Sequence, residues 1–282
     1  RKNAPCGWRK TRMNLGIIQG RVLPDQLEKL QIFPERWKEE LRLIKQLGFS
    51  HVELLDDKAS MLRSMLRSML RNTHPDIFHV IEAAGLTSQS VCMDLLADHS
   101  LLSEPAEFHQ KITELLAHFT SRPSTVFVIP FFDDNFITTQ EELDRALQAL
   151  QIHASFLEQH KLYFAVEANL SAHYFKTIWD AHKPSNIGVC YDIGNRMHDT
   201  KVDIAEEISL LFPYINHVHI KDRNEAGKNI PLRENNPRFS EAIQTLQKHN
   251  YTGLMILETQ LAPDPYEQAK RNKAVILNLR NS

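Results

Sequence analysis

The chain has few features that could cross-link it, anchor it in a membrane or attract a polyanion. Its 282 residues include three cysteines, Cys6, Cys92 and Cys190, whose odd number and wide spacing argue against a disulfide framework and for a reducing, cytoplasmic location. No apolar run approaches the roughly 20 residues that span a bilayer, so we expect no membrane partner. The net charge of −2 gives no general attraction to nucleic acid.

Strand-like and helix-like segments alternate from Asn14 to the end of the chain. Eight such pairs, joined by short connections, predict a parallel sheet closed into a (β/α)8 TIM barrel, an α/β fold that often takes about 250 residues as one domain. The expected strands cover residues 14–19, 51–55, 88–95, 125–131, 162–169, 187–192, 215–221 and 253–259. The expected helices cover residues 35–47, 75–84, 105–119, 139–159, 172–182, 203–211, 238–249 and 264–279.

Glycine-rich phosphate-binding turns are also missing. An open doubly wound sheet is the other arrangement that alternating strands and helices allow, and it usually carries such a turn after an early strand. Neither a G-x-G-x-x-G pattern nor a P-loop occurs in the sequence. The closed barrel is therefore favoured.

The first twelve residues differ in charge from the rest. They contain five basic residues and no acidic one, so residues 13–282 carry a formal charge of −7. They lack the apolar core of a secretory signal. We expect residues 1–12 to be a basic leader outside the fold, either disordered or a remnant, and residues 13–282 to form a single TIM-barrel domain.

Residues 60–71 repeat Ser-Met-Leu-Arg three times. A four-residue period stays close to the 3.6-residue helical turn, so Met and Leu form one slanted stripe and Arg another. The segment follows the second strand, at the end where barrel active sites lie. It can be a mobile lid, a dimer contact, or a plain amphipathic helix whose arginine stripe faces solvent.

Four apolar, β-prone runs in the second half of the chain each carry a metal-ligating residue near the end. In a parallel barrel these ends meet on one edge, which brings the four ligands together. Carboxylates packed so closely without a cation would repel one another. Three carboxylates and one imidazole therefore predict a divalent-cation site. The ligands are Glu167, Asp192, His219 and Glu258, and their runs are Phe164–Glu167, Val189–Asp192, His217–Ile220 and Met255–Glu258.

The strand at residues 215–221 indicates which side chains face inward. His217, His219 and Lys221 share one parity, and Val218 and Ile220 share the other, so the polar set faces the barrel interior. His219 then lies near the rim. His217 lies about 6.5 Å further down, where a hydrogen-bonded core histidine is favoured over a ligand.

Several short motifs along the chain lie in or beside the expected strands and the first helix. The most specific are Tyr191–Asn195 and His217–Asp222, and weaker ones cover Gly16–Arg21, Phe33–Trp37, Leu47–Glu53 and Ser90–Asp94. Together they resemble the xylose-isomerase-like TIM-barrel superfamily, specifically its sugar-phosphate isomerase/epimerase branch, from Met13 to the carboxyl terminus. The resemblance implies that the quartet binds one divalent metal ion. Mn²⁺ is favoured for this donor set, with Co²⁺, Mg²⁺ and Zn²⁺ as alternatives.

The resemblance also implies proton abstraction next to a carbonyl of a small carbohydrate, through an enediolate that the metal stabilises. Glu167 and Glu258 are the expected catalytic bases. The strands that carry them are separated around the rim by two other strands, which suits one base on each face of the substrate. Lys221, Arg223, Arg21 and Glu53 are candidates for binding substrate, with internal salt bridges as the alternative for Arg21, Arg223 and Glu53. Relatives often form dimers or tetramers, so a homodimer or homotetramer is expected.

The chain departs from the branch in residues 230–239, where relatives carry two glycines and an Asp-Phe pair. The altered loop predicts a different substrate. An inosose-type dehydratase could use the same metal site, since its first step is the same proton abstraction. An apurinic endonuclease-like nuclease is disfavoured, because position 195 is Asn rather than His and the chain is not basic. A non-catalytic sugar-binding protein is the remaining alternative.

Overall fold

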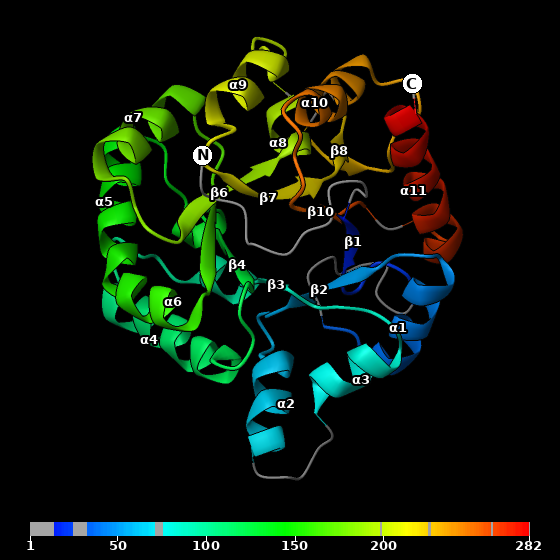
Figure 1. Ribbon diagram of the computed structural model, residues 1–282, viewed down its shortest axis with the longest axis horizontal. Helices are drawn as coiled ribbons and strands as arrows, with labels where there is room; N and C mark the ends of the chain where they lie inside the picture. Colours follow the sequence, from blue (N-terminus) through cyan, green and yellow to red (C-terminus); the bar gives the residue numbers. More distant parts are fainter. Residues whose placement is uncertain are drawn as a thin grey trace.

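Eight parallel strands form a closed barrel in a computed structural model of the chain (Figure 1), so the predicted TIM barrel is confirmed. The structure describes residues 14–24, 33–70, 76–197, 199–224, 227–260 and 262–281. The basic leader, residues 1–12, lies outside them. Around the barrel the strands follow the order β1, β10, β7, β6, β5, β4, β3 and β2. They span β1 Asn14–Ile18, β2 His51–Leu55, β3 Ser90–Cys92, β4 Val126–Pro130, β5 Tyr163–Glu167, β6 Ile187–Asp192, β7 Ile215–Ile220 and β10 Leu254–Leu257.

Helices surround the barrel (Figure 1). None of the helices among the described residues is both long enough and apolar enough to cross a membrane. The outer helices are α1 Trp37–Gln46, α2 Met61–Leu70, α3 Ile77–Ala83, α4 Pro105–Leu116, α5 Gln140–Leu150, α6 Ala154–His160, α7 Ala172–His182, α9 Ile204–Leu211, α10 Pro237–Lys248 and α11 Pro265–Asn281.

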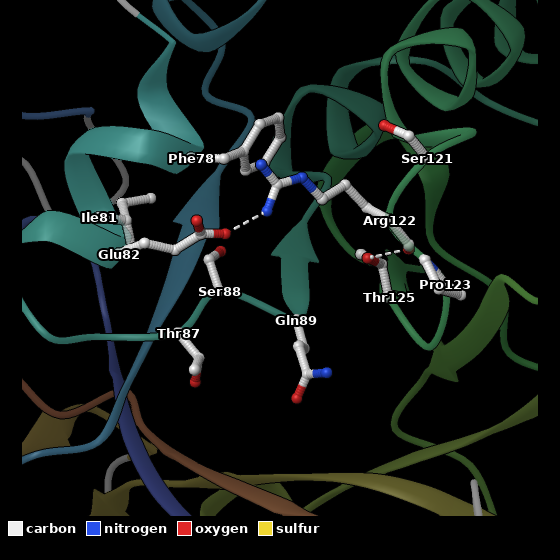
Figure 2. A pocket seen from close by; sticks show the side chains of 10 residues that line it. All are labelled: Phe78, Ile81, Glu82, Thr87, Ser88, Gln89, Ser121, Arg122, Pro123 and Thr125. Atoms are coloured by element: carbon white, nitrogen blue, oxygen red, sulfur yellow. Dashed lines mark hydrogen bonds and ion pairs between the residues drawn. The ribbon is translucent and has the colours of Figure 1, made fainter.

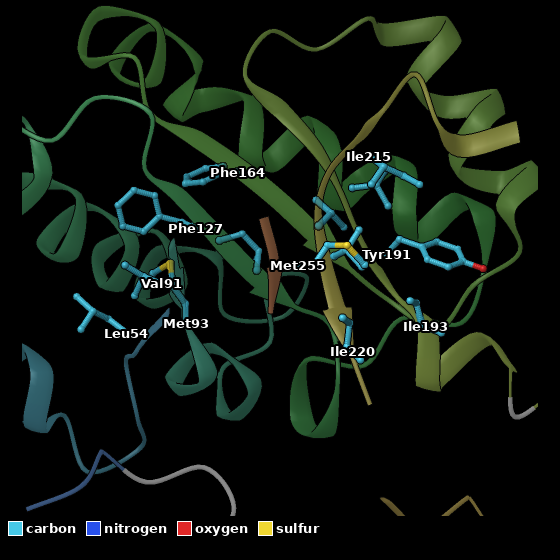
Figure 3. Packing of buried hydrophobic residues seen from close by; sticks show 14 of the residues in the cluster. Leu54, Val91, Met93, Phe127, Phe164, Tyr191, Ile193, Ile215, Ile220 and Met255 are labelled. Carbon is cyan, nitrogen blue, oxygen red and sulfur yellow. The ribbon is translucent and has the colours of Figure 1, made fainter. Parts of the chain in front are cut away.

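Side chains alternate between two apolar layers along each strand. Val91, Phe127 and Phe164 point outward, into the large cluster between strands and helices that Figure 3 shows. The barrel interior contains smaller clusters, which include Cys92 and Ile256 on one side. Near the carboxyl ends of the strands the interior side chains become polar. Apolar side chains therefore fill the barrel below, and the polar groups that could act on a ligand lie at its carboxyl edge.

Several boundaries differ from the sequence prediction for local reasons. The expected strand 88–95 is reduced to β3, because a 3₁₀ turn, η2 (Asp94–Asp98), follows it at once. The expected helix 139–159 is interrupted by a second 3₁₀ turn, η5 (Gln151–His153). A short helix, α8 (Ile193–Met197), and a hairpin of β8 (Asp222–Arg223) and β9 (Asn229–Ile230) were not predicted, and both lie at the functional end of the barrel.

The Ser-Met-Leu-Arg repeat forms helix α2 after β2. Leu62 and Leu66 are buried, as a core-facing stripe requires, whereas Met61 is 39% exposed. The arginine stripe is not uniformly solvated: Arg63 is buried, and its Nη2 lies 2.5 Å from Asp56 Oδ2. That pair ties α2 to the end of β2, so the helix is an integral part of the barrel's outer layer.

Candidate metal centre

The four predicted ligands meet at the carboxyl edge of the barrel. Glu167 and Asp192 end β5 and β6, His219 lies in β7 beside Asp192, and Glu258 follows β10. One ligand atom from each lies within 4.8 Å of the others. All four side chains are at least nine-tenths buried. Four residues that are far apart in sequence thus form one compact donor set.

The chemistry of this donor set fits a divalent cation. Ligand atoms bonded to one ion at about 2.1 Å can lie at most about 4.2 Å apart, so the four groups need only a small contraction. Asp192 Oδ2 and His219 Nδ1 are buried and make no hydrogen bond. Oxygen and imidazole donors suit Mg²⁺, Mn²⁺ or Zn²⁺. Cys190 also lies near the set, and burial raises the pKa of its thiol to about 12, but ions that prefer oxygen donors, such as Mg²⁺ and Mn²⁺, do not select a sulfur ligand.

Helix α8 orients Asp192. The backbone N–H of Asn195 donates to Asp192 Oδ1 at 3.0 Å, and the Asn195 side chain donates to Glu167 Oε1 at 3.4 Å. Gly194 permits this packing, because a Cβ at that position would come within 2.4 Å of Lys221 Cγ and 2.7 Å of Lys221 O. The short helix therefore holds two of the four ligands in place.

Lys221 brings a positive charge into the quartet. Its Nζ lies 2.5 Å from Asp192 Oδ2, without hydrogen-bond geometry at that oxygen, 3.4 Å from Glu258 Oε2 and 3.9 Å from Glu167 Oε1. Burial raises the pKa of Asp192 to about 6, although Lys221 opposes the shift. Burial acts in the same sense on Glu258, but Lys221 and His219 outweigh it and hold the pKa of Glu258 well below its usual range. The site thus balances buried carboxylates with cationic groups.

Glu53 lies beneath the quartet and contacts two histidines. His219 Nε2 lies 2.9 Å from Glu53 Oε1, a hydrogen bond, and His217 Nε2 lies 2.8 Å from Glu53 Oε2. All three side chains are buried. When His219 is the Nε2–H tautomer it donates to Glu53 and leaves the Nδ1 lone pair facing Glu258 Oε2, 3.0 Å away. His217 is buried one layer below the rim, as the alternation predicted, and Glu53 contacts both histidines inside the barrel.

We expect Glu53→Gln to weaken metal binding about 10- to 100-fold, as loss of a group that orients a ligating histidine commonly does. The neutral amide no longer favours the Nε2–H tautomer of His219. Calorimetric titration of the purified variant with Mn²⁺ measures the effect. Glu35→Gln, at an exposed position, is the matched control. An unchanged affinity in Glu53→Gln would remove Glu53 from the centre.

Arg21 reaches the quartet from the segment after β1. Its Nη2 lies 4.0 Å from Glu258 Oε1, and the side chain is buried. Glu40 of α1 holds the turn, because its Oε1 accepts from the backbone N–H groups of Gly20 at 2.8 Å and Arg21 at 3.1 Å. Gly20 has a φ of 82°, which favours glycine. Glu40 therefore positions Arg21 from outside the barrel.

Glu40 predicts a pH-dependent stability. Burial raises its pKa to about 7, although backbone N–H groups lower it. The folded state then keeps a proton that the unfolded state releases between about pH 4.5 and 7, so this group's contribution becomes unfavourable as pH rises through that window. We expect Glu40→Gln to gain stability relative to the parent from pH 4 to pH 8, by on the order of 3 kcal/mol. Urea unfolding at both pH values measures it, with Glu39→Gln as control. Parallel pH profiles for parent and Glu40→Gln would refute the prediction.

The altered loop after β7 forms its own ion pair. Arg233 donates to the buried carboxylate of Asp222 through Nε at 2.9 Å and Nη2 at 2.9 Å. Arg223 donates through Nε to Asn229 Oδ1 at 3.1 Å, across the β8–β9 hairpin. Of the basic residues expected near the substrate, Arg21 and Lys221 thus contact the quartet. Arg223 instead makes its side-chain hydrogen bond within the hairpin.

A polar cavity of about 260 Å³ lies at the other end of the barrel (Figure 2). Ser88 and Gln89, which precede β3, and Thr125, which precedes β4, form part of its wall. The guanidinium of Arg122 lies over the Phe78 ring and bonds Glu82. The cavity is therefore at the amino ends of the strands, remote from the quartet, at the face that commonly serves stability.

A closed (β/α)8 barrel with a carboxylate–imidazole quartet at its carboxyl edge defines a TIM-barrel protein with a candidate metal centre. The chain belongs to the xylose isomerase-like TIM barrel family, whose sequence model matches residues 41–278.

Comparison with known proteins finds a relative with a named activity and solved structures that share the fold. The L-ribulose-5-phosphate 3-epimerase UlaE of Shigella flexneri serotype 5b (strain 8401) is 25% identical over 251 residues, which cover 82% of this chain and 85% of that protein. A D-tagatose 3-epimerase-like protein shares the fold with a TM-score of 0.68 at 17% identity, over 95% of this chain and 99% of the other. A xylose isomerase-like TIM barrel protein from Mycobacterium smegmatis, solved in complex with magnesium, has a TM-score of 0.67 at 15% identity, over 95% and 96%.

Proposed function

We propose that this protein is a divalent-metal-dependent isomerase or epimerase of a small ketose or ketose phosphate. The observation that carries the proposal is the buried quartet of Glu167, Asp192, His219 and Glu258, with ligand atoms within 4.8 Å of one another. Mn²⁺ is the favoured ion, and Co²⁺, Mg²⁺ or Zn²⁺ suit the same donors. The sugar epimerase recorded among the relatives supports the reaction class.

The proposed chemistry is removal and return of a proton beside a carbonyl. A divalent ion bound in the quartet supplies positive charge that stabilises the enediolate. Glu167 and Glu258 approach from β5 and from the end of β10, with β6 and β7 between them. One carboxylate takes the proton from one face of the substrate, and the other returns a proton to the opposite face, which inverts the carbon.

The neighbouring groups have supporting roles in this proposal. Arg21, beside Glu258, and Lys221, within the quartet, bind substrate oxygens. Arg223 is a further candidate for the outer end of the substrate. Glu53 acts through His219 by fixing its tautomer. We also expect the active protein to be a homodimer or a homotetramer.

The alternatives differ in their products. A dehydratase of an inosose-type ketone begins with the same proton abstraction but then expels a hydroxyl group as water. A nuclease is disfavoured, because Asn195 stands where the endonuclease has a histidine and hydrogen-bonds Glu167 instead. A sugar-binding protein would bind ketoses without exchanging any proton.

The proposal is tested by elemental analysis of the purified protein, followed by deuterium incorporation from D₂O across a panel of ketoses and ketose phosphates. The expected result is one equivalent of metal per chain and deuterium at a single carbon beside the carbonyl. Loss of a hydroxyl group would favour the dehydratase. Binding without any deuterium incorporation would leave the sugar-binding alternative.

A further inference from the structure

Asp94 lies on the barrel rim directly after β3. Met93 N donates to Val128 O at 3.1 Å, and Leu95 N donates to Asp56 O at 2.8 Å, so the neighbouring strands hold the segment on both sides. Met93 packs outside the barrel (Figure 3), whereas Cys92 belongs to the interior. Asp94 opens the 3₁₀ turn η2, and its charge interacts with those of Glu258 and Arg21, so its carboxyl group lies on the side of the rim that faces the metal centre.

The carboxyl group of Asp94 is buried and incompletely bonded. Its exposure is 9%, and Oδ2 makes no hydrogen bond. A buried acceptor without a donor is unfavourable, so this oxygen is suited to a donor that arrives with a ligand. Burial raises the pKa of Asp94 to about 7, although Lys58 opposes the shift. The charges of Glu258 and Arg21 both interact with that of Asp94, so the Asp94 carboxyl group lies close enough to the metal centre to interact with its charged residues.

Among the described residues, two further carboxylates, Asp98 and Asp133, lie near Asp94. Lys58 Nζ lies 2.5 Å from Asp98 Oδ1 and 3.5 Å from Asp133 Oδ2. With Asp94, three carboxyl groups therefore lie around the Lys58 ammonium group, and the other nearby cation, Arg21, already pairs with Glu258. A phosphate dianion placed here would meet like charge, which weakens its binding. A hydroxyl group, in contrast, can donate to a carboxylate or accept from a carboxylic acid.

The segment after β7 provides other cations, among them Arg223, Lys228 and Arg233. Arg233 is bonded through two nitrogens to Asp222, so its charge is balanced within the loop. Arg223 bonds a neutral amide, Asn229, so its charge is not balanced by that partner, and a phosphate could be held there. It therefore enters the test as the competing site.

We propose that Asp94 accepts a hydrogen bond from a hydroxyl group at the end of the substrate remote from the metal centre, and that the substrate is an unphosphorylated ketose. This inference rests on the proposed function and specifies its substrate class. Asp94 thereby differs from the quartet: it recognises the substrate and takes no part in proton transfer.

The test uses the Mn²⁺-loaded full chain with three ketoses, L-ribulose, D-fructose and D-tagatose, each paired with its terminal phosphate ester. Calorimetry measures binding, and deuterium incorporation from D₂O measures turnover. We expect at least one ketose to bind about 100-fold more tightly than its ester. Asp94→Asn, which removes the charge but keeps a polar side chain, should reduce that ratio to about tenfold or less. Arg223→Gln can weaken the binding of both members of a pair, but the ratio between them should stay at about 100-fold.

The outcomes separate the inference from the proposed function. Tighter binding of an ester, lost in Arg223→Gln and unaffected by Asp94→Asn, overturns the inference, while deuterium incorporation still upholds the proposed function. Ketose binding that depends on Asp94, without incorporation, upholds the inference and overturns the epimerase. If none of the six compounds binds, the inference is overturned. Asp134→Asn, an exposed neighbour, controls for a general change in charge.

Discussion

Replacing Glu258 with glutamine is expected to lower the rate of epimerisation by about 10³-fold, within the range that a positioned acid–base group contributes. The amide keeps an oxygen near His219 Nδ1 but cannot accept the substrate proton. If Glu167 and Glu258 serve opposite faces, the variant retains one base. It should then incorporate deuterium into only one of the two epimers without interconverting them.

This one-sided exchange distinguishes loss of a base from loss of the metal. Metal content and deuterium incorporation are measured on the same preparation by elemental analysis and NMR, and Glu167→Gln should show the opposite preference. Glu241→Gln, an exposed glutamate on α10, is the matched control. Exchange with both epimers in Glu258→Gln would rule out a two-base mechanism.

Mn²⁺ is expected to raise the melting temperature substantially, because an ion that binds only the folded state stabilises it. At 100 times its dissociation constant the gain is about 2.7 kcal/mol. For a chain of this size that corresponds to roughly 5–10 °C. Asp192→Asn should reduce the metal-induced shift to about 1 °C or less, since an affinity loss of about 100-fold leaves little binding energy at the same concentration.

Asparagine at position 192 keeps an oxygen that can accept from the Asn195 N–H, so helix α8 should remain in place. Calorimetric melting curves with and without Mn²⁺ give both shifts, and Asp134→Asn provides an exposed control. A full metal-induced shift in Asp192→Asn would mean that the ion binds elsewhere.

The quartet was predictable because each of its members lies at the end of an apolar strand whose parity can be counted. The same alternation predicted the inward direction of His219 and the buried position of His217 one layer below. Strand order then followed from the repeated β–α pattern, since parallel neighbours need crossover helices. These predictions depend on local pattern and on general barrel geometry alone.

The supporting groups were not predictable in the same way. Asn195 reaches Glu167 only because α8 turns immediately after β6, and Glu40 contacts the Gly20 turn from a helix about twenty residues away. Asp94 was placed in a strand, although η2 begins there. One of the three alternatives for the repeat placed its arginines on a solvated face, but Arg63 is buried against Asp56. Each depends on tertiary packing that overrides local periodicity.

The most direct test of the central claim is an anomalous difference map from crystals grown with Mn²⁺. The account predicts one strong peak per chain, within about 2.0–2.4 Å of carboxylate oxygens of Glu167, Asp192 and Glu258 and of the Nδ1 atom of His219. A peak at any other location, or no peak at this position at saturating Mn²⁺, would contradict it.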